Sequence, residues 1–145
     1  MEEYIIYYLF NGNDLKVFEY IYESYELKSL QDEIFIDCDK PYWCSINNLV
    51  DFINSYQVGA FATVNYSVKN NCNITQISFS YMFDGYLLVG FSGKDISKKD
   101  TIDIEKKFRE IKYLDKKITV EDMPFSNKEY FKKTGIGDIG DKYPK

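Results

Sequence analysis

The sequence contains no histidine, and this absence excludes several kinds of chemistry. Neither a Ser-His nor a Cys-His nucleophilic pair can be built within the chain, and no imidazole can hold a metal ion. A zinc site would need all the cysteines plus a carboxylate, and Cys38 and Cys44 are spaced too widely for the usual knuckle. Buried or incidental thiols are the better interpretation.

Cysteines and long apolar runs are scarce as well. The 3 cysteines are an odd number and follow no secretory leader, so we expect a reduced, cytoplasmic protein without a disulfide framework. No run reaches the ~18 apolar residues of a membrane-spanning helix. We therefore expect no membrane association.

Two segments match ligand-binding motifs in part, but the residues around them do not fit the function of the motif. The glycines of Gly135-x-Gly137-x-x-Gly140 follow a lysine-rich helical segment instead of a strand, and only five residues remain after them. Asp37 begins an EF-hand-like pattern that has Tyr42 where the turn glycine is needed. Carboxylates are abundant, but no pair stands out as a catalytic acid and base. We therefore expect no cofactor, no metal and no enzymatic activity.

Charge is distributed unevenly along the chain. Residues 1–58 hold 11 acidic residues against 3 lysines, a net of −8, whereas residues 94–145 hold 14 basic residues against 11 acidic ones, a net of +3. An acidic first third argues against nucleic acid as the partner and favours a basic protein through long-range attraction. The lysines of the last third are interleaved with acids, which is typical of a solvated helix face.

The central stretch, Ile74–Ser92, consists of two β-rich runs around Asp84-Gly85. Asp-Gly between apolar runs is the strongest short-range hairpin signal and favours a two-residue type I′ turn. That turn predicts Tyr81 opposite Leu88 and Phe79 opposite Gly90, with Phe79 covering the bare glycine. Both faces of the hairpin would then be largely apolar and covered.

Hydrophobic periodicity predicts the other elements. Residues 14–26 read as a helix, with a second hairpin strand as the open alternative. Ser126 to Glu129 has the form of a capping box. The predicted strands are Tyr4–Phe10, Glu33–Cys38, Ala60–Val68 and Ile118–Val120, and the predicted helices lie near 14–26, 45–57, 102–116 and 127–133.

These elements predict the fold class α+β. The expected architecture is an antiparallel β-sheet meander over about residues 60–92, extended by the N-terminal strands and packed with three to four helices. Residues 1–134 would form a single domain and 135–145 a flexible C-terminal tail.

One segment resembles a binding surface in composition. In Asp37–Trp43, a proline holds a loop at an expected strand-to-helix corner and presents aromatic side chains beside carboxylates. The alternative is that the Trp43 side chain is buried in the hydrophobic core at the start of the next helix. The residues predicted to bind a partner are Asp37, Asp39, Tyr42, Trp43, Glu19, Glu23 and Asp84.

By elimination, the sequence favours a non-enzymatic, cytoplasmic protein-binding module. The expected partner is a basic protein, and the expected role is that of an inhibitor or immunity protein that neutralises a nuclease-like bacterial toxin. Two alternatives remain: a small-molecule-binding or enzymatic domain with a cleft between the sheet and residues 94–117, and a homo-oligomeric structural protein. The sequence does not determine the oligomeric state.

Overall fold

The computed structural model describes most of the chain. The described residues are 4–12, 15–29, 33–37, 42–45, 61–69, 73–82, 84–94, 96–119 and 128–133. Their strands are β1 (Tyr4–Asn11), β2 (Lys28–Ser29), β3 (Glu33–Asp37), β4 (Tyr42–Ser45), β5 (Phe61–Ser67), β6 (Gln76–Tyr81), β7 (Tyr86–Gly93) and β8 (Asp115–Thr119). Their helices are α1 (Leu15–Ser24), α3 (Lys98–Lys106) and α4 (Lys128–Lys133).

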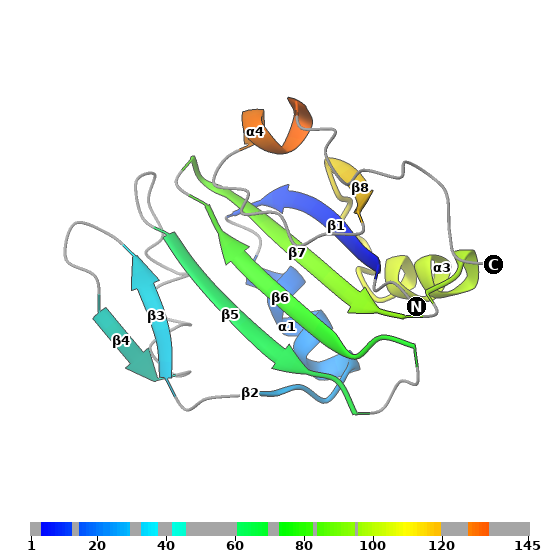
Figure 1. Cartoon of the computed structure of the whole chain (residues 1–145), viewed down its shortest axis with the longest axis horizontal. Helices are drawn as coiled ribbons and strands as arrows, with labels where there is room; N and C mark the ends of the chain where they lie inside the picture. Colours follow the sequence, from blue (N-terminus) through cyan, green and yellow to red (C-terminus); the bar gives the residue numbers. More distant parts are fainter. Residues whose placement is uncertain are drawn as a thin grey trace.

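The strands form one antiparallel sheet, so the predicted α+β class is confirmed. Its order is β4-β3-β5-β6-β7-β1-β8, and β2 also pairs with β5 (Figure 1). The predicted meander is present as β5-β6-β7, and the N-terminal strand β1 extends it by pairing with β7. The expected three to four helices are not supported: among the described helices, only α1 and α3 exceed two turns.

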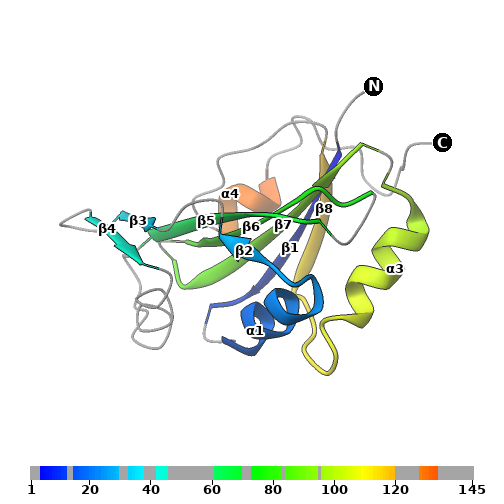
Figure 2. The same cartoon turned by 90° about the horizontal axis from the view of Figure 1, so that it is seen from below.

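The helices lie on both sides of the sheet. α1 and α3 pack against one side and α4 against the other (Figure 2). None of the described helices is long and apolar enough to cross a membrane.

Helix α3 differs from the predicted helix at both ends. It begins at Lys98 because Ser97 is its N-cap: the Ser97 backbone N–H donates a hydrogen bond to the Asp100 carboxylate at 2.8 Å. After Lys106 the chain makes tighter turns, with Arg109 in the left-handed region at φ 58°. The predicted extension to residue 116 is therefore wrong, because β8 begins at Asp115.

The other predicted elements agree only partly with the structure. Residues 14–26 were predicted to form either a helix or a second hairpin strand, and the structure has a helix there, α1. Tyr42 begins β4, which pairs back onto β3, so the expected strand-to-helix corner is instead a β-hairpin. Ser45, the predicted start of the helix at 45–57, ends strand β4 instead. The rest of that helix, the capping residue Ser126 and the tail at 135–145 lie outside the described residues.

The central hairpin has a different turn from the predicted one. The Met82 backbone N–H donates to Tyr86 O at 2.9 Å, the Gly85 N–H donates to Met82 O at 3.2 Å, and Gly85 has a φ of 89°. A tight turn followed by a glycine at positive φ is the usual three-residue hairpin loop, and here it joins Met82 to Tyr86. The predicted two-residue type I′ turn is therefore wrong, and the register shifts by one residue.

This shift of register changes which residues of the two strands share a face of the hairpin. Tyr81 pairs with Leu87, and Phe79 pairs with Val89. One face of the hairpin thereby carries only large buried side chains, which join the main core between the sheet and helices α1 and α3. Those six side chains are Ile77, Phe79, Tyr81, Leu87, Val89 and Phe91.

The opposite face is polar in part, whereas the sequence predicted a largely apolar face. Ser78 pairs with Gly90, and Ser80 with Leu88, and both serines are half-buried. A Cβ at Gly90 would lie 2.8 Å from Ser78 Oγ and 2.9 Å from Tyr7 Cε1. An aromatic ring does lie over this glycine, but it comes from Tyr7 of β1 and not from Phe79.

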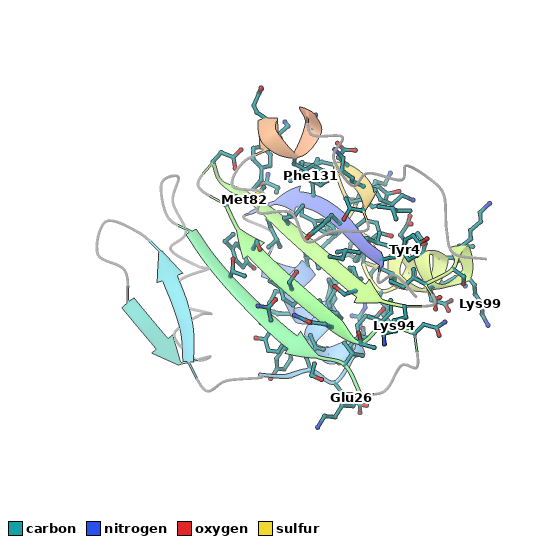
Figure 3. The ribbon with its side chains drawn as sticks, viewed as in Figure 1. Tyr4, Glu26, Met82, Lys94, Lys99 and Phe131 are labelled. Carbon is teal, nitrogen blue, oxygen red and sulfur yellow. The ribbon has the colours of Figure 1, made fainter. Side chains whose placement is uncertain are left out.

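Helix α4 covers a second, smaller apolar cluster on this side of the sheet. Phe131 is fully buried against Tyr7, Leu9, Met82 and Leu88. In Figure 3, Phe131 of α4 and Met82 of the hairpin are labelled at the end of the sheet that α4 covers. The sheet therefore has an apolar core on each side, the larger one beneath α1 and α3.

Candidate interaction surface

Helix α1 presents carboxylates to solvent while its other side is anchored in the main core. Val17 and Ile21 are fully buried, and the Phe18 ring lies 4.9 Å from Phe79 in an edge-on arrangement. Because the apolar residues recur at helical spacing, Glu19 and Glu23 lie together on the outer side. Both are exposed.

No feature of the described fold uses these two carboxylates. Neither forms an ion pair or a hydrogen bond with another described residue. They are four residues apart on one face, a spacing at which like charges repel, and the exposed Lys16 is the nearest basic residue on the helix. Within the described part of the chain, Glu19 and Glu23 thus have no cationic partner.

The Asp37–Trp43 segment lies at an edge of the sheet. Ile36 pairs with Tyr42, and Phe35 with Trp43, so Asp37 ends β3 directly beside the start of β4. Asp39 lies outside the described residues. The aromatic residues predicted to bind a partner thus belong to an edge strand.

Asp84 has a role inside the fold. Its Oδ2 accepts a hydrogen bond at 2.6 Å from the backbone N–H of Lys128, the first residue of α4. Lys128 Nζ donates to Tyr86 Oη at 3.3 Å and lies 4.7 Å from the centre of that ring. Asp84 Oδ1 is buried without a hydrogen-bond partner. Asp84 therefore fastens α4 to the hairpin tip.

Some of the residues predicted to bind a partner lie close together in the structure, and others lie apart. β3 and β6 are both antiparallel to β5, so Asp37 and the hairpin tip at Asp84 lie at the same end of the sheet (Figure 1). Glu19 and Glu23 lie instead on the helix layer that covers the main core (Figure 2). Helix α1 thus presents its acidic face apart from that end of the sheet.

The space between the sheet and α3 is filled with side chains. The Phe108 ring lies 4.9 Å from the Tyr8 ring and 5.0 Å from the Phe10 ring, and Ile104 is almost fully buried beside them. A cleft at this position was one of the sequence-based alternatives. Among the described residues, these packed rings occupy that part of the space.

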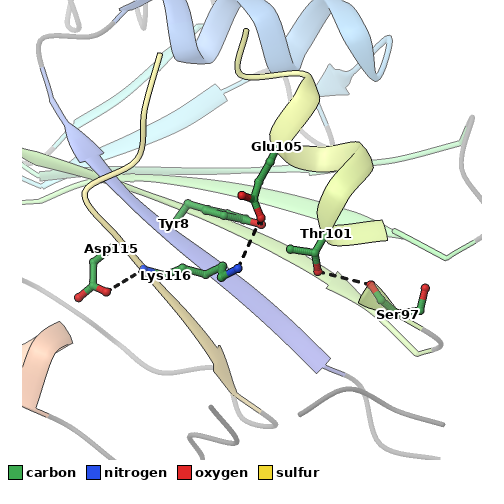
Figure 4. A network of polar contacts seen from close by, with 6 residues as sticks. All are labelled: Tyr8, Ser97, Thr101, Glu105, Asp115 and Lys116. Atoms are coloured by element: carbon green, nitrogen blue, oxygen red, sulfur yellow. Dashed lines mark hydrogen bonds and ion pairs between the residues drawn. The ribbon is translucent and has the colours of Figure 1, made fainter. Parts of the chain in front are cut away.

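Sequence reasoning missed a polar network at the margin of this core. Glu105 Oε2 accepts a hydrogen bond from Tyr8 Oη at 3.1 Å and lies 3.5 Å from Lys116 Nζ (Figure 4). These residues are far apart in the sequence, so no local pattern signals their contact. The network ties α3 to β1 and β8. The described residues contain no group of acidic or cysteine side chains that could hold a metal ion.

Burial perturbs two tyrosines of the main core. Desolvation, followed by the negative charges of Asp103 and Asp100, raises the pKa of Tyr25 well above its ordinary value. Desolvation, followed by Tyr22, raises the pKa of Tyr66 in the same way. Both hydroxyls are therefore protonated at neutral pH and are poor candidates for a catalytic base.

Comparisons with known proteins assign no family. No protein-family model matches the chain, and no curated protein matches it in sequence. Among solved structures, the chain is similar to one in a crystal structure of the toxic C-terminal tip of CdiA from Pseudomonas aeruginosa in complex with immune protein. The identity is 15%, the TM-score is 0.43, and the match covers 88% of this chain and 90% of that chain. Values this low establish neither a shared fold nor a shared function.

Proposed function

We propose that this protein is a non-enzymatic, cytoplasmic protein-binding module, an inhibitor or immunity protein that neutralises a basic, nuclease-like bacterial toxin. In this proposal an acidic, aromatic surface docks on the toxin and blocks it. The acidic first third of the chain would attract the basic partner over a distance and speed their association.

The observation that carries the proposal is the outer face of α1. Glu19 and Glu23 are exposed and serve no described contact within the fold. These two carboxylates, which have no partner among the described residues, form a fixed anionic surface because the opposite side of α1 is buried in the core. We propose that they contact lysine or arginine side chains of the partner.

The remaining predicted residues lie apart from α1, at one end of the sheet, and would form a second contact with the partner. Asp37, Tyr42 and Trp43 belong to the paired strands β3 and β4, and Asp84 lies at the same end of the sheet. Asp39 is kept in the proposal from the sequence alone. Aromatic anchors beside charges are typical of the residues that dominate binding energy. Asp84 would take part only through the hairpin tip that it already holds to α4.

Charge reversal on α1 tests the proposal. Capture from the native host at low salt identifies a candidate partner, whose purified form is then titrated with wild-type protein and with Glu23→Lys. We expect Glu23→Lys to weaken binding at least about tenfold, because attraction becomes repulsion at a desolvated contact. The matched control is Glu129→Lys on α4, which changes the net charge equally on the other side of the sheet.

Two results would count against this function. One is the absence of any basic partner at low salt, and the other is an affinity that Glu23→Lys leaves unchanged. Trp43 offers a second readout, because it is the only tryptophan in the chain. Its fluorescence should shift when the partner covers β4, and Trp43→Ala should reduce affinity.

A further inference from the structure

Helix α3 has a basic outer face with an apolar residue at its centre. Ile102 is 49% exposed, although it is a large aliphatic side chain in the middle of a helix. Lys98 and Lys99 lie one turn before it, Lys106 lies one turn after it, and all three lysines are exposed. At about 100° per residue these four side chains share one arc of the helix. The lysines make no ion pair with another described residue.

Helix α1 contacts the segment that directly follows α3. The Arg109 guanidinium lies 4.3 Å from the centre of the Tyr20 ring, and Lys107 Nζ lies 5.0 Å from the centre of the Tyr25 ring. These contacts join α1 to the end of α3 in one layer on the same side of the sheet (Figure 2). Figure 3 shows Lys99 projecting outward from α3, with Lys94 nearby.

The two faces carry opposite charges that the fold does not neutralise. Glu19 and Glu23 point outward from α1, and the lysines around Ile102 are exposed on α3. Each chain thus carries both halves of a complementary pair in one layer. A two-fold axis beside this layer would bring each acidic face onto the basic face of the other copy and form both contacts at once.

We propose that a second copy of this chain covers these faces, forming a two-fold dimer. The α1 carboxylates of each copy contact Lys98 and Lys99 of the other, and Ile102 loses its exposure to water at the centre of each contact. Surface ion pairs contribute little individually and are screened by salt. The dimer is therefore weak, populated at ~100 µM protein in low salt and dissociated at ~0.5 M salt.

This inference does not rest on the proposed function, because it needs only the chain itself. The two are linked, since dimer formation occupies Glu19 and Glu23. A basic partner and a second copy would therefore compete for α1, and binding of the partner would dissociate the dimer.

An exchange of charges between the two faces tests the dimer by sedimentation equilibrium. The α1 variant is Glu19→Lys with Glu23→Lys, and the α3 variant is Lys98→Glu with Lys99→Glu. Each variant alone places like charges at both contacts, so we expect its self-association to weaken at least about tenfold. An equal mixture of the two variants restores opposite charges at both contacts and should form a heterodimer.

The controls separate the interface from net charge and folding. Lys69→Glu with Lys132→Glu makes the same charge change as the α3 variant at exposed positions outside α1 and α3, and should leave the dimer intact. Acidic residues in the first turn of a helix are favourable, so the α3 variant should fold, as circular dichroism would verify. Ile102→Ser should weaken the dimer without changing the charge.

Several outcomes would overturn the dimer. They are a wild-type protein that stays monomeric at ~500 µM in low salt, a mixture of variants that does not associate, and oligomers that keep growing with concentration. None of them affects the proposed function, because the α3 variant keeps Glu19 and Glu23 and should still bind the basic partner.

Discussion

Tyr8 and Tyr66 are both fully buried tyrosines, yet their hydroxyl groups have different surroundings. Tyr8 Oη donates a hydrogen bond to Glu105, whereas Tyr66 Oη has no hydrogen-bond partner among the residues that the structure describes. A buried hydroxyl without a partner has lost its bonds to water and gained nothing in exchange. The tyrosine hydroxyl therefore stabilises the folded state at position 8 and destabilises it at position 66.

Exchanging each tyrosine for phenylalanine tests this difference. We expect Tyr8→Phe to lower the free energy of unfolding by about 1.5 kcal/mol, because it removes a bond to a charged group. Tyr66→Phe should leave the free energy of unfolding unchanged or raise it by up to ~1 kcal/mol. Chemical denaturation at neutral pH measures both values, and equal losses in the two variants would contradict the assignment.

The raised pKa of Tyr66 also predicts a pH dependence. Above about pH 10 the hydroxyl ionises in the unfolded chain but stays protonated in the folded one. The folded state then binds more protons, so stability is complete below about pH 10 and falls as the pH rises further. In Tyr66→Phe this part of the alkaline decline should be missing, which denaturation between about pH 9 and 11 would detect.

At the scale of elements, one carboxylate joins the start of α3 to the turn before β6. Asp100 Oδ2 accepts hydrogen bonds from Ser97 N at 2.8 Å and from Asn73 Nδ2 at 3.0 Å. Asp100 is nearly buried, and Asn73 precedes β6 in the chain. The helix cap is thus also a tertiary contact.

Asp100→Ala should destabilise the protein more than the loss of an ordinary cap. We expect the free energy of unfolding to fall by about 2 kcal/mol, at the upper end for lost caps, because Asn73 also loses its acceptor. Thermal unfolding checks this value. Asp103→Ala is the matched control, since Asp103 lies one turn later, is half-buried, and caps nothing; a similar loss in both variants would contradict the role of Asp100.

At the scale of the whole molecule, the two apolar clusters lie on opposite sides of one sheet. Neighbouring residues of β1 supply both, since Tyr8 contributes to the main core and Leu9 to the cluster beneath α4. Because Tyr8 and Leu9 are adjacent in β1, loss of packing in one cluster disturbs the backbone that supports the other cluster. We therefore predict that the described elements unfold together as one domain.

Truncations on the two sides test this cooperativity. Phe108→Ala in the main core and Phe131→Ala beneath α4 should each lower the free energy of unfolding by about 3–5 kcal/mol, a large share of the total for a domain. Circular dichroism and tyrosine fluorescence should report one shared transition. Ile102→Ala, at an exposed position, should change little. A Phe131→Ala variant that loses α4 without a shift of the main transition would contradict a single domain.

The sequence by itself determined the features that depend on neighbours along the chain. Alternating apolar residues predicted β5, β-rich runs around Asp84-Gly85 predicted β6 and β7, and helical spacing favoured α1. The absence of histidine excluded sites that need an imidazole. The exposure of Glu19 and Glu23 also followed from helical spacing, because a helix with one buried side directs the other to solvent.

The tertiary structure decided whatever depends on contacts between distant segments. The loop that joins Met82 to Tyr86 set the hairpin register, since one added loop residue changes every cross-strand pair. Asp84 holds α4, and Tyr20 and Tyr25 bring α1 beside α3, through contacts that no local pattern encodes. Periodicity fixes which side of an element is buried, but only packing decides which elements share a surface, and the proposed acidic and basic faces depend on that packing.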